Sequence, residues 1–167
     1  MQDNLGVTLL EALVVLAVIV ITTIIAVPSF ITFIQERRLT LAAENLYYAM
    51  QTARSEAIKR NATIYVSFQT GDSWCFGANT GSNCTCTTPS GCNIGTAQAP
   101  QSQQLTLSTT GLTSNSFQFE GTRGASNVSS GKITLTLYGQ TTSVSILIGN
   151  LGNIQLCSSL SGYQACP

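Results

Sequence analysis

The residues that could carry acid–base chemistry are few in this chain of 167 residues. The chain has no histidine, which removes the commonest general base and the commonest metal ligand. Beyond about residue 60 the only carboxylates are Asp72 and Glu120, and they form no recognisable acid/base pair. We therefore expect a protein that is not an enzyme and that needs no cofactor.

One carboxylate, Glu11, lies inside an apolar run that covers residues 6–33 and holds no other charge. A helix rises about 1.5 Å per residue, so about 20 residues cross a hydrocarbon core of roughly 30 Å, and residues 7–27 suffice. A carboxylate in such a segment costs of order 3 kcal/mol unless it meets an opposite charge. Because an ordinary signal anchor would not need this charge, we expect Glu11 to be functional.

Six cysteines could form disulfides or hold a metal ion. They are Cys75, Cys84, Cys86, Cys92, Cys157 and Cys166. The first four have the spacing C-x8-C-x-C-x5-C, which lacks the paired C-x2-C knuckles that zinc sites favour. In a chain exported behind a membrane anchor, an even number of cysteines indicates disulfides, and we expect no metal site.

The elements that must position these residues begin with one long helix, which we expect from about Thr8 to Arg60. Residues at spacings of three and four mark one face of its second half, and small alanines there suit close packing on a sheet. This stripe consists of Leu39, Ala43, Leu46, Met50, Ala53 and Ala57. Asn61 is a plausible end of the helix.

After the helix, alternation of apolar and polar residues predicts antiparallel strands. The alternating pairs and triplets are Ile64, Val66 and Phe68; Leu105 and Leu107; Phe117 and Phe119; Ile133, Leu135 and Leu137; Val144, Ile146 and Ile148; and Ile154 and Leu156. Residues 74–76 could begin a further strand, and residues 77–104 read as a loop that cysteines would staple. One helix laid across an antiparallel sheet makes an α+β domain.

The start of the chain resembles the class III signal of type IV pilins and pseudopilins, carried by Gly6, Val7, Thr8, Leu9 and Glu11 (GVTLLE). The resemblance implies that a prepilin peptidase cuts after Gly6 and methylates the new amine of Val7. It also implies that Glu11 pairs with the N-terminal amine of a neighbouring subunit during assembly. Two features depart from the pattern: the leader has no lysine or arginine, and Val7 replaces the commoner Phe or Met.

Three further segments are similar to the GspH/FimT-like family of minor pilins and pseudopilins. They are residues 51–61 (QTARSEAIKRN), 119–124 (FEGTRG) and 151–157 (LGNIQLC). The resemblance implies a leader at residues 1–6, a membrane and assembly helix at 7–34, and an extracytoplasmic type IV pilin domain at 35–167, with helix at 35–60 and β-rich structure at 62–167. It also implies a C-terminal loop closed by Cys157 and Cys166. The other four cysteines would then pair together; three pairings are possible, and Cys84 with Cys86 is disfavoured as strained.

The family suggests three functions for such a chain. The first is a minor pilin that assembles into or initiates a type IV pilus, and the second is an H-class pseudopilin of a type II secretion system. The third is DNA uptake, where family members carry Gly-Arg-x-Arg on the closing strand; here Asn153 and Gln155 replace both arginines. Any residual DNA contact would fall to Arg54, Lys59 and Arg60, too few cations for strong binding.

The same resemblance implies partners and a location. The partners are other major and minor pilins or pseudopilins, the prepilin peptidase and the inner membrane; DNA is not expected. The chain would sit in the bacterial inner membrane as a single-pass protein before assembly. It would then move into a pilus fibre or a periplasmic pseudopilus.

Overall fold

The computed structural model describes residues 8–88, 90–99 and 105–166. The chain divides into two compact units, Met1–Glu36 and Arg37–Pro167, and the boundary lies within a single helix, α1 (Leu9–Arg60). The start of α1 is capped by Thr8, whose Oγ1 accepts a hydrogen bond from the backbone N of Glu11 at 3.3 Å. The helix therefore begins one residue after the expected start.

The end of α1 is set by Asn61, which has a φ of +48°. The backbone N of Asn61 donates to Ile58 O at 3.2 Å, and that of Ala62 donates to Ala57 O at 3.1 Å. These two bonds form a Schellman motif, in which a left-handed residue satisfies the last helical carbonyls. Asparagine tolerates this conformation better than most side chains, so the predicted helix end is confirmed.

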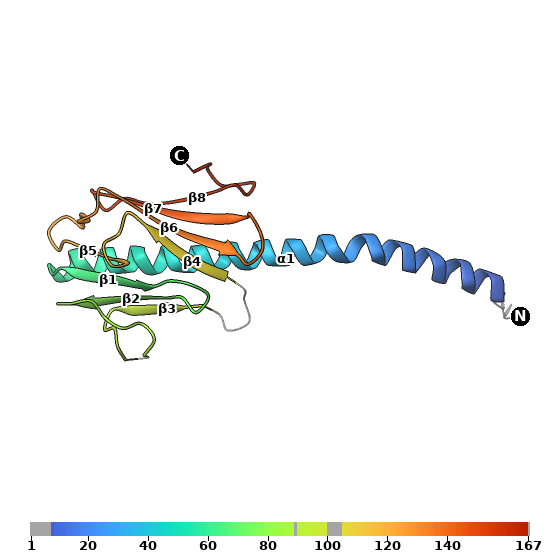
Figure 1. Ribbon diagram of the computed structural model, residues 1–167, viewed down its shortest axis with the longest axis horizontal. Helices are drawn as coiled ribbons and strands as arrows, with labels where there is room; N and C mark the ends of the chain where they lie inside the picture. Colours follow the sequence, from blue (N-terminus) through green and yellow to red (C-terminus); the bar gives the residue numbers. More distant parts are fainter. Residues whose placement is uncertain (1–7, 89, 100–104, 167) are drawn as a thin grey trace, which may run out of the picture. The chain divides into compact units, whose positions relative to one another are not determined.

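Among the described residues, eight antiparallel strands follow the helix in two four-stranded sheets (Figure 1). The first sheet has the order β3-β2-β1-β5, with β1 at Ile64–Gln69, β2 at Cys75–Thr80, β3 at Gly95–Gln98 and β5 at Ser116–Phe119. The second has the order β4-β6-β7-β8, with β4 at Leu105–Thr110, β6 at Ser130–Leu137, β7 at Ser143–Gly149 and β8 at Ile154–Ser158.

The α+β class is confirmed, but two expectations about the strands were incomplete. The strands form two sheets instead of one. The stretch 77–104 is not all loop, because β2 continues to Thr80 and β3 occupies Gly95–Gln98. The side chains of β3 alternate between half-buried and exposed, so its residues carry no apolar alternation that the sequence could reveal.

The core lies between α1 and the sheets, and within residues 37–166 Figure 1 shows the helix running alongside both of them. All six residues of the predicted stripe, Leu39, Ala43, Leu46, Met50, Ala53 and Ala57, are fully buried. Four phenylalanines of the first sheet pack ring against ring, with centroids 5.0 to 6.2 Å apart. The alternating residues of β6 and β7 are buried too, so the helical and strand periods both identified the core correctly.

Candidate functional site

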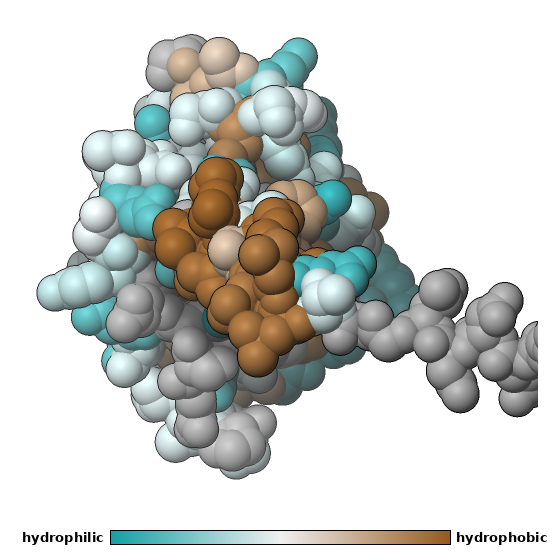
Figure 2. All heavy atoms as spheres, turned by 90° about the vertical axis from the view of Figure 1, so that its right-hand side faces the viewer, coloured by the Kyte–Doolittle hydropathy of each residue, from teal (hydrophilic) through white to brown (hydrophobic). Residues whose placement is uncertain are grey.

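The first unit consists, as far as it is described, of the apolar part of α1. By length and composition, α1 is able to cross a membrane. Its large apolar side chains are exposed, and Figure 2 shows such side chains gathered over one region of the surface. They are Leu9, Leu10, Leu13, Val14, Val15, Leu16, Val18, Ile19, Val20, Ile21, Ile24, Ile25, Val27, Phe30, Ile31 and Phe33. A surface of this extent indicates contact with lipid or with protein.

The polar side chains of this segment are few, and two of its threonine hydroxyls donate hydrogen bonds to carbonyls of the same helix. Thr22 Oγ1 donates to Val18 O at 2.9 Å, and Thr23 Oγ1 donates to Ile19 O at 2.6 Å. The carboxylate of Glu11 lies exposed in the first turn of α1. Gly6 and Val7, the expected cleavage site, lie outside the described residues. Glu11 is thus the one charged side chain described within residues 8–35.

In the second unit, Arg54 joins three stretches of the chain. Its Nε donates to Gly124 O at 3.0 Å, and its Nη2 donates to Leu151 O at 3.2 Å. Gly124 lies in the connection from β5 to β6, and Leu151 lies in the turn from β7 to β8. These are the three segments whose sequences resemble the GspH/FimT-like family. The arginine therefore ties α1 to a connection between the two sheets and to a turn of the second sheet.

Two glycines make this arrangement, which we call the Arg54 clamp (Arg54, Gly124, Leu151 and Gly152), sterically possible. A Cβ at Gly152 would lie 1.8 Å from Gly124 O and 3.0 Å from Arg54 Nε. A Cβ at Gly124 would lie 2.8 Å from Ile58 Cδ1. Both glycines also have a positive φ, +63° at Gly124 and +72° at Gly152, which residues with a side chain rarely adopt. The sequence analysis assigned Arg54 only a residual contact with DNA; the glycines of the two motifs were the signal of its structural role.

The other two basic residues near the end of α1 are paired with Glu56. Lys59 Nζ lies 3.3 Å from Glu56 Oε1, and Arg60 Nε lies 2.6 Å from Glu56 Oε2. The bonds from Arg60 and then Lys59 lower the pKa of the Glu56 carboxyl. Glu56 therefore offsets one of the three positive charges of Arg54, Lys59 and Arg60, and the guanidinium of Arg54 is engaged by two carbonyls.

The closing strand β8 offers no charge where the DNA-binding pattern would need it. Asn153 and Gln155 are both exposed on β8 or directly before it. Asn153 O accepts a hydrogen bond from the backbone N of Gly149 at 3.0 Å, which closes the turn from β7. The remaining basic residues of the β-rich part, Arg123 and Lys132, stand on different elements.

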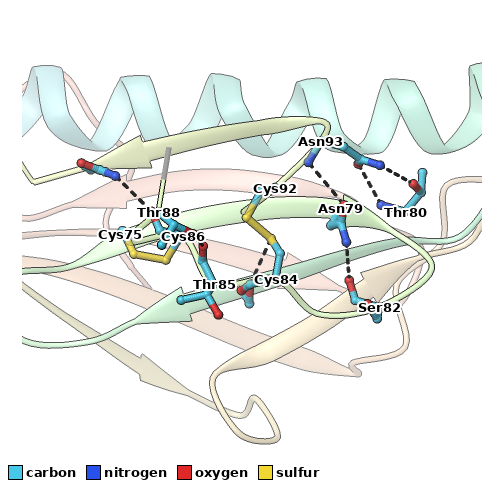
Figure 3. The surroundings of a disulfide bond; sticks show 12 residues. Cys75, Asn79, Thr80, Ser82, Cys84, Thr85, Cys86, Thr88, Cys92 and Asn93 are labelled. Carbon is cyan, nitrogen blue, oxygen red and sulfur yellow. Dashed lines mark hydrogen bonds between the residues drawn. A yellow bond between two sulfur atoms is a disulfide. The ribbon is translucent and has the colours of Figure 1, made fainter. Parts of the chain in front are cut away.

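Two disulfides hold the connection between β2 and β3 of the first sheet. They are Cys75–Cys86 and Cys84–Cys92 (Figure 3). The pairing is one of those that the sequence left open, and it avoids the disfavoured bond between Cys84 and Cys86. Cys75 begins β2, so the first bond anchors the connection between β2 and β3, and the second closes a short ring within that connection.

Side-chain amides hold the same connection to β2. Asn93 Nδ2 donates to Thr80 Oγ1 at 2.7 Å, and Asn93 Oδ1 accepts from the backbone N of Thr80 at 3.1 Å (Figure 3). Asn79 Nδ2 donates to Ser82 O at 3.1 Å. Beneath the sulfurs lies Gly77, where a Cβ would come within 2.4 Å of Cys92 Sγ and 2.9 Å of Cys84 Sγ. A glycine in a strand often marks such a close approach.

The C-terminal loop is closed by the disulfide Cys157–Cys166, the pair that the resemblance implied. Its Tyr163 hydroxyl donates to Glu44 Oε1 on α1 at 2.6 Å, a contact that the sequence did not reveal. Burial and then the bond to Glu44 raise the pKa of Tyr163 from 10.0 to about 12. The loop is therefore attached to the helix as well as to β8.

The described residues show no arrangement that resembles a reaction centre. Among them, no three His, Cys, Asp or Glu side chains lie close enough together to hold a metal ion. Asp72 accepts a hydrogen bond from the hydroxyl of Thr106 and so serves to join the β1–β2 turn to β4. A hollow of about 380 Å³ lies between residues 67–70 of the chain and residues 84–86, and its lining is uncharged.

Comparison with known sequences places this geometry in a family. The profile described as "Type II transport protein GspH" matches residues 42–152, more than half of the chain. The chain belongs to the GspH family. The match begins within the buried stripe of α1 and includes all of the Arg54 clamp, so the residues that the clamp joins lie inside the family's common region. GspH-family proteins are pilin-type structural proteins, and this chain has a pilin-type structural role.

Solved structures show the same fold. Two crystal structures of the type IV minor pilin FimU of Pseudomonas aeruginosa, in space groups P21 and P65, match with TM-scores of 0.57 and 0.55. Both are 20% identical to this chain; the matches cover 78% and 75% of it, and 99% and 100% of the FimU chains. At this identity the likeness establishes the type IV pilin fold. No curated protein sequence matches the chain significantly.

Proposed function

We propose that this GspH-family chain is a minor pilin that is built into, or initiates, a type IV pilus through its N-terminal helix. The observation that carries the proposal is the one charge, Glu11, described in the exposed apolar part of α1. In hydrocarbon a carboxylate needs an opposite charge. The amine of a neighbouring subunit, freed by cleavage after Gly6, would supply that charge in an assembled fibre and not in an isolated membrane anchor.

The proposal includes processing and location. A prepilin peptidase would cut between Gly6 and Val7 and methylate Val7, and the mature chain would wait in the inner membrane with residues 35–167 outside the cytoplasm. Intact-mass measurement of the protein recovered from membranes tests this directly. A mature chain that still begins at Met1 would remove the basis of the proposal.

Replacement of Glu11 tests the assembly role. Glu11→Ala should leave membrane insertion intact, because removing a charge makes an apolar helix easier to insert. It should reduce the amount of the chain in sheared fibres. Thr23→Ala is a matched control, since the hydroxyl of Thr23 is bonded within the helix. Normal amounts of the Glu11→Ala chain in fibres would contradict the proposal.

The second candidate is an H-class pseudopilin of a type II secretion system, and the description of the matching family favours it. The same helix and the same processing would then serve a periplasmic pseudopilus. The two candidates differ in what a deletion removes. Loss of surface fibres upon deletion supports the pilus, whereas loss of secreted enzymes with normal fibres supports the pseudopilus.

A further inference from the structure

The two disulfides beside the first sheet interlace along the chain. Cys75 pairs with Cys86, which lies beyond Cys84, and Cys84 pairs with Cys92 (Figure 3). We call these two bonds the native set. In the consecutive set, each cysteine would pair with the next one, Cys75 with Cys84 and Cys86 with Cys92. Pairing in chain order therefore does not produce the native set.

The unfolded chain favours the consecutive set. Four cysteines allow three sets of two bonds, and the third set contains the strained bond between Cys84 and Cys86. The consecutive bonds would join residues 9 and 6 positions apart, whereas the native bonds join residues 11 and 8 positions apart. Because the probability of closing a loop falls as about the 3/2 power of its length, the consecutive set is favoured about twofold. An unfolded chain thus acquires the native set in only about one third of its molecules.

Contacts that select the native set involve residues beyond the last of these four cysteines. Asn93 binds Thr80, as described above, and Gln98 Nε2 donates to Cys86 O at 3.0 Å. The inference rests on the proposed function at this one point, the export of the β-rich part behind its membrane anchor. A chain exported from its anchored end exposes Cys75 first and these contacts last. Consecutive bonds can therefore form before the fold selects against them.

Burial makes the native set the end point of exchange between the bonds. Cys75 and Cys86 are 2% and 4% exposed, so their bond is shielded from thiolates in the folded chain. Cys84 and Cys92 are only half-buried. A Cβ at Gly77 would lie 2.4 Å from Cys92 Sγ, 2.9 Å from Cys84 Sγ and 3.0 Å from Cys86 Cβ. The two bonds therefore lie beside each other, as exchange between them requires.

We propose that this chain is a substrate for thiol–disulfide isomerisation, in which an external thiol converts the consecutive set into the native set. The external thiolate attacks Cys92 Sγ and forms a mixed disulfide, and Cys86 leaves as a thiolate. Cys86 attacks Cys75 Sγ, which forms Cys75–Cys86 and releases Cys84 as a thiolate. Cys84 then attacks Cys92 Sγ, which forms Cys84–Cys92 and returns the external thiolate. Two disulfides are present before and after, so the sequence needs no oxidant or reductant.

Oxidation and refolding of the full chain test the exchange. The reduced chain is oxidised with diamide in guanidinium chloride and transferred to detergent without oxidant, and its bonds are mapped by mass spectrometry. We expect the native set in about one third of the molecules and the consecutive set in most others. Reduced glutathione should then raise the native fraction about threefold, to nearly all molecules. A consecutive set that converts without thiol, or that glutathione leaves unchanged, would overturn the proposal.

Cells without periplasmic disulfide isomerase activity test whether the exchange occurs during maturation. The chain recovered from them should carry mainly the consecutive set, whereas Cys157–Cys166, which joins neighbouring cysteines, should form as in normal cells and serves as the internal control. In the double variant Cys75→Ser, Cys86→Ser, the bond Cys84–Cys92 has no interlaced partner and should form equally in both kinds of cell. The native set at its normal level without the isomerase refutes the proposal, and so does a double variant that still depends on it.

These measurements read the pairing of cysteines and not assembly. A negative result in them leaves the proposed function intact, because incorporation of the Glu11→Ala chain is measured separately. Conversely, a mature chain that still begins at Met1 would remove the proposed function, while the result of oxidation and refolding would stand.

Discussion

Replacement of Arg54 by methionine should lower the free energy of unfolding of residues 37–167 by about 2–4 kcal/mol. Methionine keeps an apolar stem, which in Arg54 lies beside Gly124, but leaves two carbonyls without their donors. A hydrogen bond to a charged group contributes about 1.5–3 kcal/mol, and this applies to the half-buried bond with Gly124. The exposed bond with Leu151 adds about 0.5–1 kcal/mol, because water replaces it easily.

Thermal unfolding measures this loss on the full chain in detergent. The chain has one tryptophan, Trp74, which is buried directly before β2 in the second unit, so its fluorescence reports on the β-rich part and not on the membrane segment. For a unit of this size the expected loss lowers the melting temperature by about 8–16 °C, at about 4 °C per kcal/mol. The melting temperature of Arg54→Lys should fall between those of the original chain and Arg54→Met, because an ammonium lacks the planar fork that reaches both carbonyls.

Arg38→Met supplies the matched control. Arg38 is also an arginine of α1, and its side chain is exposed. Such a surface change should alter stability by less than about 0.5 kcal/mol. The reasoning fails if Arg54→Met melts within about 2 °C of the original chain, or if Arg38→Met loses as much. In either case the two hydrogen bonds would not be what holds the motif segments together.

Three other predictions concern the disulfides, the C-terminal loop and DNA binding. Gly77→Ala should cost about 1–3 kcal/mol by crowding the disulfide sulfurs, whereas Gly95→Ala, which has open space around its Cβ, should not; equal melting temperatures would contradict this. The raised pKa of Tyr163 predicts a contribution to stability that is complete below pH 10 and lost as the pH rises toward 12; Tyr163→Phe should abolish that loss in pH-dependent unfolding. The full chain should bind duplex DNA no more tightly than about 10⁻⁴ M at physiological salt, and arginines at Asn153 and Gln155 should strengthen binding in a mobility-shift assay; tight binding by the original chain would restore the DNA-uptake hypothesis.

The sequence alone predicted the elements whose signal is local. The helical period of the stripe and the two-residue period of β1, β6 and β7 depend only on which side chains can face a core together. The end of α1 at Asn61 is equally local, because a left-handed asparagine and two nearby backbone bonds produce it. For these features, neighbours in the sequence are also neighbours in space.

The tertiary structure alone decided what depends on distant partners. Nothing local divides the strands into two sheets, pairs Cys75 with Cys86, or places Tyr163 against Glu44. The clearest case is Arg54, whose two acceptors lie 70 and 97 residues away along the chain. By composition it was one of seven basic residues and a possible DNA contact. Only the fold brings two carbonyls to its guanidinium, so that this one side chain joins α1 to the β5–β6 connection and to the turn between β7 and β8.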